Sequence, residues 1–136
     1  MGLRRKARQF AVQFLYGLDL NREEREESLR SFWNANRTSP AIREFAAELI
    51  NGTLDHLDTI DQKIEEHSRN WKMGRIALVD KNILRIAVYE LIFREDIPAA
   101  VSIDEAVEIA RYFGTPDSGR FVNGILDNIQ KESSNQ

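Results

Sequence analysis

The sequence predicts an all-α protein with about seven helices. Apolar residues recur three and four positions apart through nearly the whole chain, which is the period of an amphipathic helix. No stretch sustains the alternation of apolar and polar residues that marks a strand. Serine and proline also stand where helices should begin, and glycine where a helix should end.

The first half of the chain contains three predicted helical stretches. Residues 1–20 carry one apolar stripe, which consists of Ala7, Phe10, Ala11, Phe14, Leu15 and Leu18. A charged run follows, and then a short helix around Leu29, Phe32 and Trp33. Ser39 and Pro40 are suited to begin a long helical pattern that continues to residue 64. Asn51-Gly52 either kinks this helix or lets its apolar face continue.

The second half begins with a predicted break at residues 70–74, where Trp71 is expected to anchor the packing. We expect Asp80 to cap the next helix. That helix is apolar almost all round between Ile83 and Ile92, so it should be the buried centre of the fold.

Two further helices are expected near the carboxyl end. Ser102 and Glu105 have the spacing of a capping box. Gly114 is expected to end that helix as a C′ glycine. Thr115-Pro116 then restarts a helix, whose apolar face runs from Phe121 to Ile129.

Composition favours a globular protein of one domain, residues 1–136, with 42% hydrophobic and 30% charged residues. The absence of cysteine excludes disulfides and thiolate zinc sites, and it fits the reducing cytoplasm. His56 and His67 do not have ligand spacing on one helix face, so we expect no metal and no cofactor. Glutamines interrupt the first apolar run, and no apolar stretch approaches the roughly 20 residues of a membrane span.

No motif in the chain is suited to catalysis. There is no G-x-S-x-G turn, no H-E-x-x-H helix and no glycine-rich phosphate loop after a strand. Glu65 and Glu66 are adjacent, so on a helix they point about 100° apart and cannot flank one bond. We therefore expect a binding protein and not an enzyme.

The amino terminus concentrates positive charge in Arg4, Arg5, Lys6 and Arg8, although the net charge of the protein is -3. A helix would group these side chains on neighbouring turns. Such a cluster is either a solvated chain end or a patch that binds phosphates.

Residues 113–124, FGTPDSGRFVNG, are rich in groups that can meet a nucleic acid. A helix beginning near Pro116 would offer unpaired N–H groups to a phosphate. Arg120 lies just inside that end, and Phe121 has a ring that can stack on a base. Local reasoning leaves a second interpretation open, in which Gly114 and Thr115 are helix caps and Phe121 belongs to the core.

Three segments together resemble the NusB family of transcription antitermination factors: RRKARQFAVQFLY, KNILRIAVYEL and IDEAVEIARYFGTPDSGRFVNGILD. The resemblance covers essentially the whole chain except residues 21–38. It implies two packed helical subdomains without catalytic activity. It also implies binding of boxA RNA in ribosomal RNA leaders together with ribosomal protein S10 (NusE), within an RNA polymerase antitermination complex.

The resemblance also implies which residues bind. The RNA would contact Arg4, Arg5, Lys6, Arg8, Phe113, Gly114, Asp117, Ser118, Arg120, Phe121 and Asn123. Tyr16 and Asp80 would face S10. Helical projection supports a surface role for Tyr16, because Arg5, Gln9, Val12 and Tyr16 form an arc opposite the apolar stripe.

Several alternatives remain open from the sequence. A neighbouring helix of the same chain could cover the arc that carries Tyr16. The protein could be an adaptor that binds proteins and no RNA, or an RNA-modifying enzyme. The free protein could be a monomer, or a homodimer that occludes the RNA surface.

Overall fold

The computed structural model describes residues 2–68 and 72–134, and within these ranges the chain forms seven α-helices, one short 3-10 helix and no strand. The expected all-α class is confirmed. The α-helices are α1 (Leu3–Leu20), α2 (Arg25–Ala35), α3 (Pro40–Asp55), α4 (Leu57–His67), α5 (Leu78–Phe93), α6 (Ala99–Phe113) and α7 (Ser118–Ser134). The 3-10 helix is η1 (Met73–Arg75). The expectation for Trp71 lies outside the described residues.

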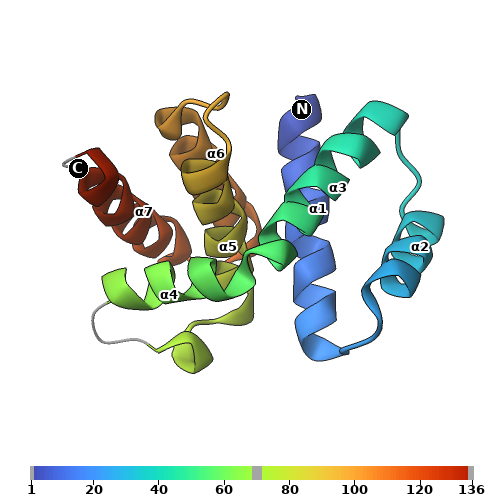
Figure 1. The fold of residues 1–136 in the computed structure, drawn as a ribbon, viewed down its shortest axis with the longest axis horizontal. Helices are drawn as coiled ribbons and strands as arrows, with labels where there is room; N and C mark the ends of the chain where they lie inside the picture. Colours follow the sequence, from blue (N-terminus) through green and yellow to red (C-terminus); the bar gives the residue numbers. More distant parts are fainter. Residues whose placement is uncertain (1, 69–71, 135–136) are drawn as a thin grey trace.

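The helices form two groups around α5. Figure 1 shows α1, α2 and α3 on one side of the molecule and α4 to α7 on the other. Helix α5 contacts α1 and α3 in the first group and α4, α6 and α7 in the second. The buried apolar side chains of both groups form one cluster. The apolar helix predicted over residues 83–92 is therefore the element that joins the two halves.

Aromatic rings attach α2 to α1. Phe10 of α1 meets Phe32 and Trp33 of α2 edge to face, with ring centroids 6.1 and 5.7 Å apart. Phe14 also meets Phe32 edge to face at 5.5 Å. Such pairs add specific geometry to the burial of apolar area. Residues 21–38, which carry no signal of the family, thus supply a packed cover for α1.

Helix α3 continues through Asn51-Gly52 without a break and ends at Asp55. Its start is as expected, because the Ser39 hydroxyl accepts a hydrogen bond of 3.3 Å from the Ile42 N–H. A β-carbon on Gly52 would lie 2.1 Å from Cζ of Tyr89 on α5. The glycine therefore lets the Tyr89 ring of α5 lie against α3, and the helix continues through this position.

Two expected helix caps are wrong. Helix α6 begins at Ala99, directly after Pro98, so Ser102 lies inside the helix. The Ser102 hydroxyl instead donates a hydrogen bond of 2.7 Å to Glu90 of α5. Helix α5 begins at Leu78, which places Asp80 in its first turn and not at the cap.

The turn between α6 and α7 also differs from expectation. Gly114 has a φ of −94°, which any residue adopts, so it is not a left-handed C′ glycine. A β-carbon there would lie 2.3 Å from the Ser118 hydroxyl oxygen. That oxygen accepts a hydrogen bond of 2.9 Å from the Thr115 N–H. Helix α7 begins at Ser118, three residues after Thr115.

Polar side chains of α5 fasten it to other helices. Arg85 donates two hydrogen bonds of 2.8 and 2.9 Å to the Asp61 carboxylate on α4. It also reaches Asp19 on α1 at 3.0 Å, and Asn82 donates to the same carboxylate. Polar residues of the KNILRIAVYEL segment therefore have structural partners.

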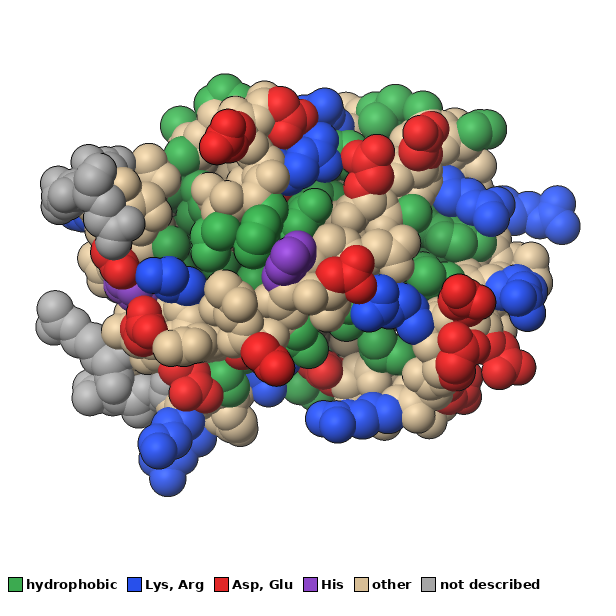
Figure 2. Space-filling view, viewed as in Figure 1, with side chains coloured by type: hydrophobic (Ala, Val, Ile, Leu, Met, Phe, Trp, Pro, Cys, Tyr) green, Lys and Arg blue, Asp and Glu red, His purple; other side chains and the backbone are tan. Residues whose placement is uncertain are grey.

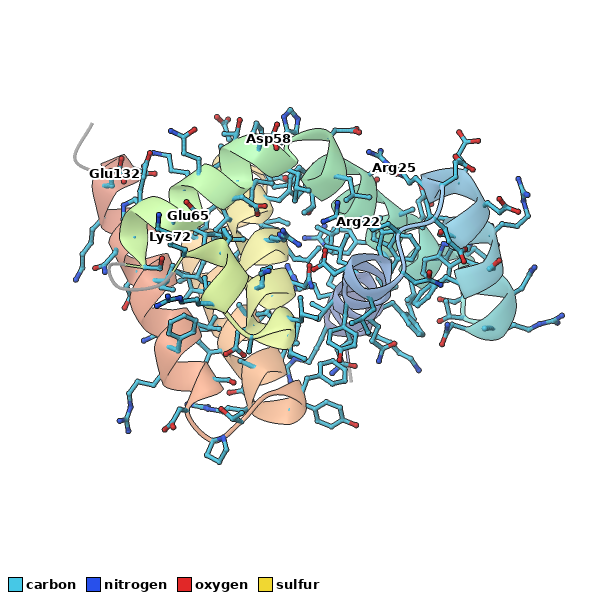
Figure 3. The ribbon with its side chains drawn as sticks, turned by 90° about the horizontal axis from the view of Figure 1, so that it is seen from below. Arg22, Arg25, Asp58, Glu65, Lys72 and Glu132 are labelled. Carbon is cyan, nitrogen blue, oxygen red and sulfur yellow. The ribbon has the colours of Figure 1, made fainter. Side chains whose placement is uncertain are left out.

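Helices α4 and α7 are tied near the carboxyl end of α7. Figure 3 shows Glu132 of α7 beside α4. Its carboxylate lies 3.1 Å from the Lys63 ammonium and forms a second ion pair with His67. Potential metal-ligating atoms of Glu66, His67 and Glu132 lie within 4.8 Å of one another. The Lys63 ammonium already supplies positive charge at this point.

Candidate nucleic-acid interface

The four basic residues of the amino terminus do not form one exposed cluster. Arg4 and Lys6 are exposed, and Arg5 is half-buried. The Arg5 guanidinium lies 2.6 Å from the Glu105 carboxylate on α6. The hydrogen bond from Arg5 to Glu105 raises the pKa of Arg5, so this side chain stays charged.

Arg8, also expected to contact RNA, is buried and is paired within the fold. Its side chain is 4% exposed, and it donates two hydrogen bonds of 2.8 Å to the Glu90 carboxylate, whose side chain is 1% exposed. Val12, one turn further along α1, is buried as well. Helices α5 and α6 cover this arc of α1, as Ile83 and Ala106 line the same small space as Arg8 and Val12. The arc is therefore not a free surface at these two positions.

Arg4 is held at the surface by an aromatic ring. Its guanidinium carbon lies 4.7 Å from the centroid of the Phe45 ring on α3. The guanidinium carbons of Arg8 and Arg94 lie within 5.7 and 5.5 Å of the same ring. Cations are attracted to the face of an aromatic ring, so Phe45 gathers three arginines around it.

A groove of about 650 Å³ brings the amino terminus together with the 113–124 segment. Arg5 of α1 and Arg111 of α6 line it beside Arg120 and Asn123 of α7. Arg120 and Asn123 are exposed and available to a ligand. The groove also contains carboxylates: Asp104 lines it, and so does Glu108, which lies 2.7 Å from Arg111. We call this surface the arginine groove.

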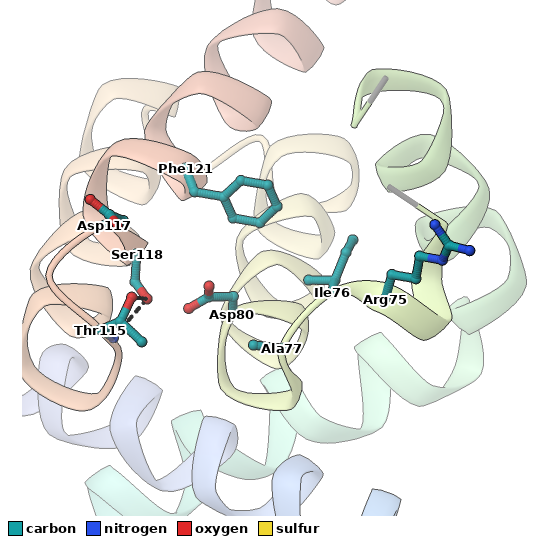
Figure 4. Close-up of a pocket in the computed structure, with 8 residues that line it drawn as sticks. All are labelled: Arg75, Ile76, Ala77, Asp80, Thr115, Asp117, Ser118 and Phe121. Atoms are coloured by element: carbon teal, nitrogen blue, oxygen red, sulfur yellow. Dashed lines mark hydrogen bonds between the residues drawn. The ribbon is translucent and has the colours of Figure 1, made fainter. Parts of the chain in front are cut away.

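Phe121 faces a different hollow, of about 310 Å³, between the beginnings of α5 and α7 (Figure 4). Its half-buried ring lies across this hollow from Ile76, with Asp80 and Asp117 on the wall. Oxygen Oδ1 of Asp80 is buried and has no hydrogen-bond partner among the described residues. Arg120 and Phe121, both expected to contact RNA, therefore line two different hollows.

The other residues expected to contact RNA differ in exposure. Asp117 is exposed, whereas Phe113 and Gly114 are half-buried. Ser118 is buried, with 1% exposed, and its hydroxyl belongs to the turn before α7. The geometry gives Ser118 and Gly114 structural roles in the turn.

Tyr16 and Asp80 come from adjacent helices. The hydrogen bond of 3.0 Å between Asn82 and Asp19 places the last turns of α1 beside the beginning of α5. Tyr16 lies one turn before Asp19 and is 36% exposed, so no helix of the described chain covers it fully. Asp80 lies two residues before Asn82, and it is 9% exposed.

Charges of both signs are mixed over the surface. Figure 2 shows acidic and basic side chains interspersed on one face of the molecule, with apolar patches between them. No helix in the described part of the chain has the length and apolar character that a membrane span requires. An all-α scaffold with surface hollows lined by arginine, asparagine and aromatic side chains defines a binding protein.

Comparisons with known proteins identify the family. The NusB family model matches residues 5–131. The chain is 42% identical to transcription antitermination protein NusB of Thermodesulfovibrio yellowstonii, over 95% of this chain and 92% of that protein. It is 47% identical to the protein of the same name from Trichlorobacter lovleyi, over 96% and 92%. The chain therefore belongs to the NusB family.

Solved structures agree with this assignment. The structure of T. maritima NusB matches with a TM-score of 0.86 and 41% identity, over 95% of this chain and 91% of that one. A structure described as antitermination factors NusB and NusE in complex with dsRNA matches with a TM-score of 0.87 and 30% identity, over 97% and 98%. The family consists of antitermination proteins and not of enzymes, which confirms the expectation that this chain is not an enzyme.

The sequence did not single out two residues of the surface. Arg111 lines the arginine groove and also a hollow beside it, and Tyr112 lines that second hollow with 71% of its surface exposed. A signal was present, since both residues directly precede Phe113 and neither belongs to the apolar stripe of α6. Their relation to Arg5 depends on the packing of α6 against α1, which the local sequence does not reveal.

Proposed function

We propose that the protein is a transcription antitermination factor that binds boxA-type single-stranded RNA of ribosomal RNA leaders together with ribosomal protein S10 (NusE). It acts in the cytoplasm as one domain, residues 1–136, within an RNA polymerase antitermination complex. The observation that carries the proposal is the arginine groove, where Arg5 of α1 meets Arg120 and Asn123 of α7. Relatives support the proposal in two ways: they are named transcription antitermination protein NusB, and one similar solved structure is described as NusB and NusE in complex with dsRNA.

The chemistry of the groove suits a polynucleotide. Guanidinium groups bind phosphate oxygens in a bidentate manner, and the Asn123 amide can donate to and accept from a base edge. Arg4 and Lys6 extend the positive charge along α1. The carboxylates of Glu105 and Glu108 compete for two of the arginines, which disfavours loose binding of any anion. Arg8 contributes to RNA binding indirectly, because its pair with Glu90 holds α1 against α5.

Unpaired RNA is the proposed form because the hollow beside the groove offers the Phe121 ring. Unstacked bases can lie on an aromatic ring and present their edges to side chains, whereas a duplex cannot offer them. The protein partner is proposed to bind at Tyr16 and Asp80, on the adjacent helices α1 and α5. Neither residue lines the arginine groove, whereas Asp80 shares the hollow of Phe121, so RNA and S10 would lie side by side there.

Binding to a boxA-like RNA, measured by fluorescence anisotropy over a range of salt concentrations, tests the function. Arg120→Gln should weaken binding and lower the slope of log K against log salt by roughly 0.7 for each phosphate that the variant no longer neutralises. Arg30→Gln is the control, because Arg30 is an exposed arginine on α2, outside the groove. A duplex of the same sequence should compete weakly. Equal binding of RNA by Arg120→Gln, or S10 binding without any RNA binding, would contradict the proposal.

A further inference from the structure

Tyr112 presents the most exposed large apolar side chain in the described part of the protein, with 71% of its surface accessible. It lies in the last turn of α6, immediately before the turn that leads to α7. Its ring meets the Phe113 ring edge to face at 5.0 Å, so the ring is supported on one side. The other face of the ring is therefore accessible to a ligand.

The surroundings of Tyr112 include cationic groups of two helices. Its ring lines a hollow of about 290 Å³ with Arg5 and Gln9 of α1 and with Glu108 and Arg111 of α6. Arg5, Glu108 and Arg111 also line the arginine groove. The two hollows are therefore neighbours that share three lining residues, and Tyr112 lines the hollow that Asn123 does not.

This combination fits a single-stranded nucleic acid. Positive groups that follow a backbone, interleaved with exposed rings on which bases stack, form the usual surface for unpaired strands. The two arginines of the hollow are each held by one carboxylate, Arg5 by Glu105 and Arg111 by Glu108, and both pairs reach solvent. A phosphate can replace such an exposed carboxylate at small energetic cost.

We propose that Tyr112 is a stacking platform for an unpaired RNA base. The RNA path then continues from the arginine groove into the neighbouring hollow that Tyr112 lines. This inference rests on the proposed function and names one more contact in the same interface. The base on Tyr112 is bound through its face and not its edge, so this position accepts any base. Arg5 and Arg111 hold the phosphates on either side of it.

The test compares Tyr112→Ala, Tyr112→Phe and the wild type for binding to a boxA-like RNA. Tyr112→Ala should weaken binding roughly 5- to 140-fold, the effect expected when one base–aromatic stack is removed. Tyr112→Phe retains the ring and should bind nearly as the wild type does. Val101→Ala is the control, since Val101 is another exposed apolar residue of α6 and is 43% exposed.

Two further measurements identify why Tyr112→Ala should bind RNA more weakly. The salt dependence of binding should be unchanged in Tyr112→Ala, because a stack involves no phosphate, and reduced in Arg111→Gln. RNA carrying 2-aminopurine at successive positions should show one position whose fluorescence is quenched by the wild type and by Tyr112→Phe but not by Tyr112→Ala.

The outcomes separate this inference from the function on which it depends. Absence of RNA binding by the wild type would refute the proposed function. Normal RNA binding by the wild type and by Tyr112→Ala, with weaker binding by Arg120→Gln, would overturn the Tyr112 platform alone. A change of oligomeric state in Tyr112→Ala, seen by sedimentation without a change in RNA affinity, would show that the ring serves a contact between copies and would also overturn it.

Discussion

Arg8 and Glu90 are 82 positions apart in the sequence and face each other through two hydrogen bonds of 2.8 Å, both nearly inaccessible to solvent. The Ser102 hydroxyl donates to the same carboxylate at 2.7 Å. One arginine of the basic amino terminus is thereby a structural link between α1, α5 and α6. The amino terminus therefore combines exposed basic side chains, Arg4 and Lys6, with a buried one that holds three helices together.

Removing this link should strongly destabilise the protein. Arg8→Ala leaves the Glu90 carboxylate buried and without its counter-ion, and breaking a buried pair in this way typically costs about 3–5 kcal/mol. Urea denaturation measures the change in the free energy of unfolding. Arg4→Ala is the matched control, with an expected change below about 1 kcal/mol because Arg4 is exposed. Equal stability of the two variants would refute the structural role of Arg8.

Two glycines in the middle of helices should respond in opposite directions to alanine. Gly52→Ala places a β-carbon against the Tyr89 ring and must displace this ring or the helices themselves, so it should lower the melting temperature. A β-carbon on Gly124 meets nothing within 4 Å, so Gly124→Ala should stabilise the protein by about 0.5–1 kcal/mol. Thermal melts of both variants test the pair, and Gly52→Ala combined with Tyr89→Leu should regain part of the stability.

The link between α4 and α7 should weaken in acid. The hydrogen bond from Lys63 lowers the pKa of Glu132 below its ordinary 4.5, with the charges of Lys63 and His67 adding to the effect. A lowered pKa in the folded state means that the stabilisation is present above pH 4.5 and disappears as the pH falls through the folded pKa. An NMR titration of the Glu132 carboxyl should therefore show a pKa below 4.5, which rises in Lys63→Met. An unchanged pKa in that variant would exclude Lys63 as the cause.

Phe121→Ala should reduce both stability and RNA affinity. The ring is half-buried and packs against the core, so the decrease in stability should stay below about 3 kcal/mol, less than for a fully buried phenylalanine. Removal of a stack in the hollow of Figure 4 should weaken RNA binding by about 1–3 kcal/mol. A melt and a binding curve of the same preparation separate the two effects. Normal affinity of the folded fraction would leave Phe121 with a packing role alone.

Tyr16→Asp should abolish binding to purified S10 and affect RNA binding by the isolated protein only weakly. The substitution places a charge where a half-exposed ring offers apolar area and a polar tip to a partner. Calorimetry with S10 measures the effect, and circular dichroism verifies that the variant is folded. Undiminished S10 affinity in a folded variant would remove Tyr16 from the partner surface.

Local periodicity predicts most of the helices, because most of them bury one stripe of their own residues. It does not predict the division at His56, where the single pattern expected up to residue 64 separates into α3 and α4. The same reasoning identifies α5 as the central helix and Ser39 as a cap. It fails at Ser102 and Glu105, which have the spacing of a capping box. Their side chains instead form hydrogen bonds with Glu90 and Arg5 on other helices. A local motif and a tertiary contact can use the same residue types, and the sequence alone does not distinguish them.

The candidate site is predictable in its residues and not in its geometry. Arg5 and Arg120 are both candidates from the sequence, yet their meeting in one groove depends on the packing of α6 between α1 and α7. Arg8 looks like a surface residue because it is charged and lies outside the apolar stripe of α1, and the helices that cover it lie far along the chain. Gly114 suggests a left-handed backbone, whereas it is the Ser118 side chain that excludes a larger residue.

The separation along the sequence between α1 and its ionic partners has a consequence for synthesis on the ribosome. Arg5 and Glu105 are separated by 100 positions, and α1 is the first helix to leave the tunnel. At about 5–20 residues per second, the nascent chain carries α1 for roughly 5–20 s before α6 exists to receive it. Helices α2 and α3 emerge earlier and can pack against α1 during that interval, whereas the ion pair with Glu105 cannot yet form. The docking of α1 on α6 therefore comes late, once translation has passed Glu105.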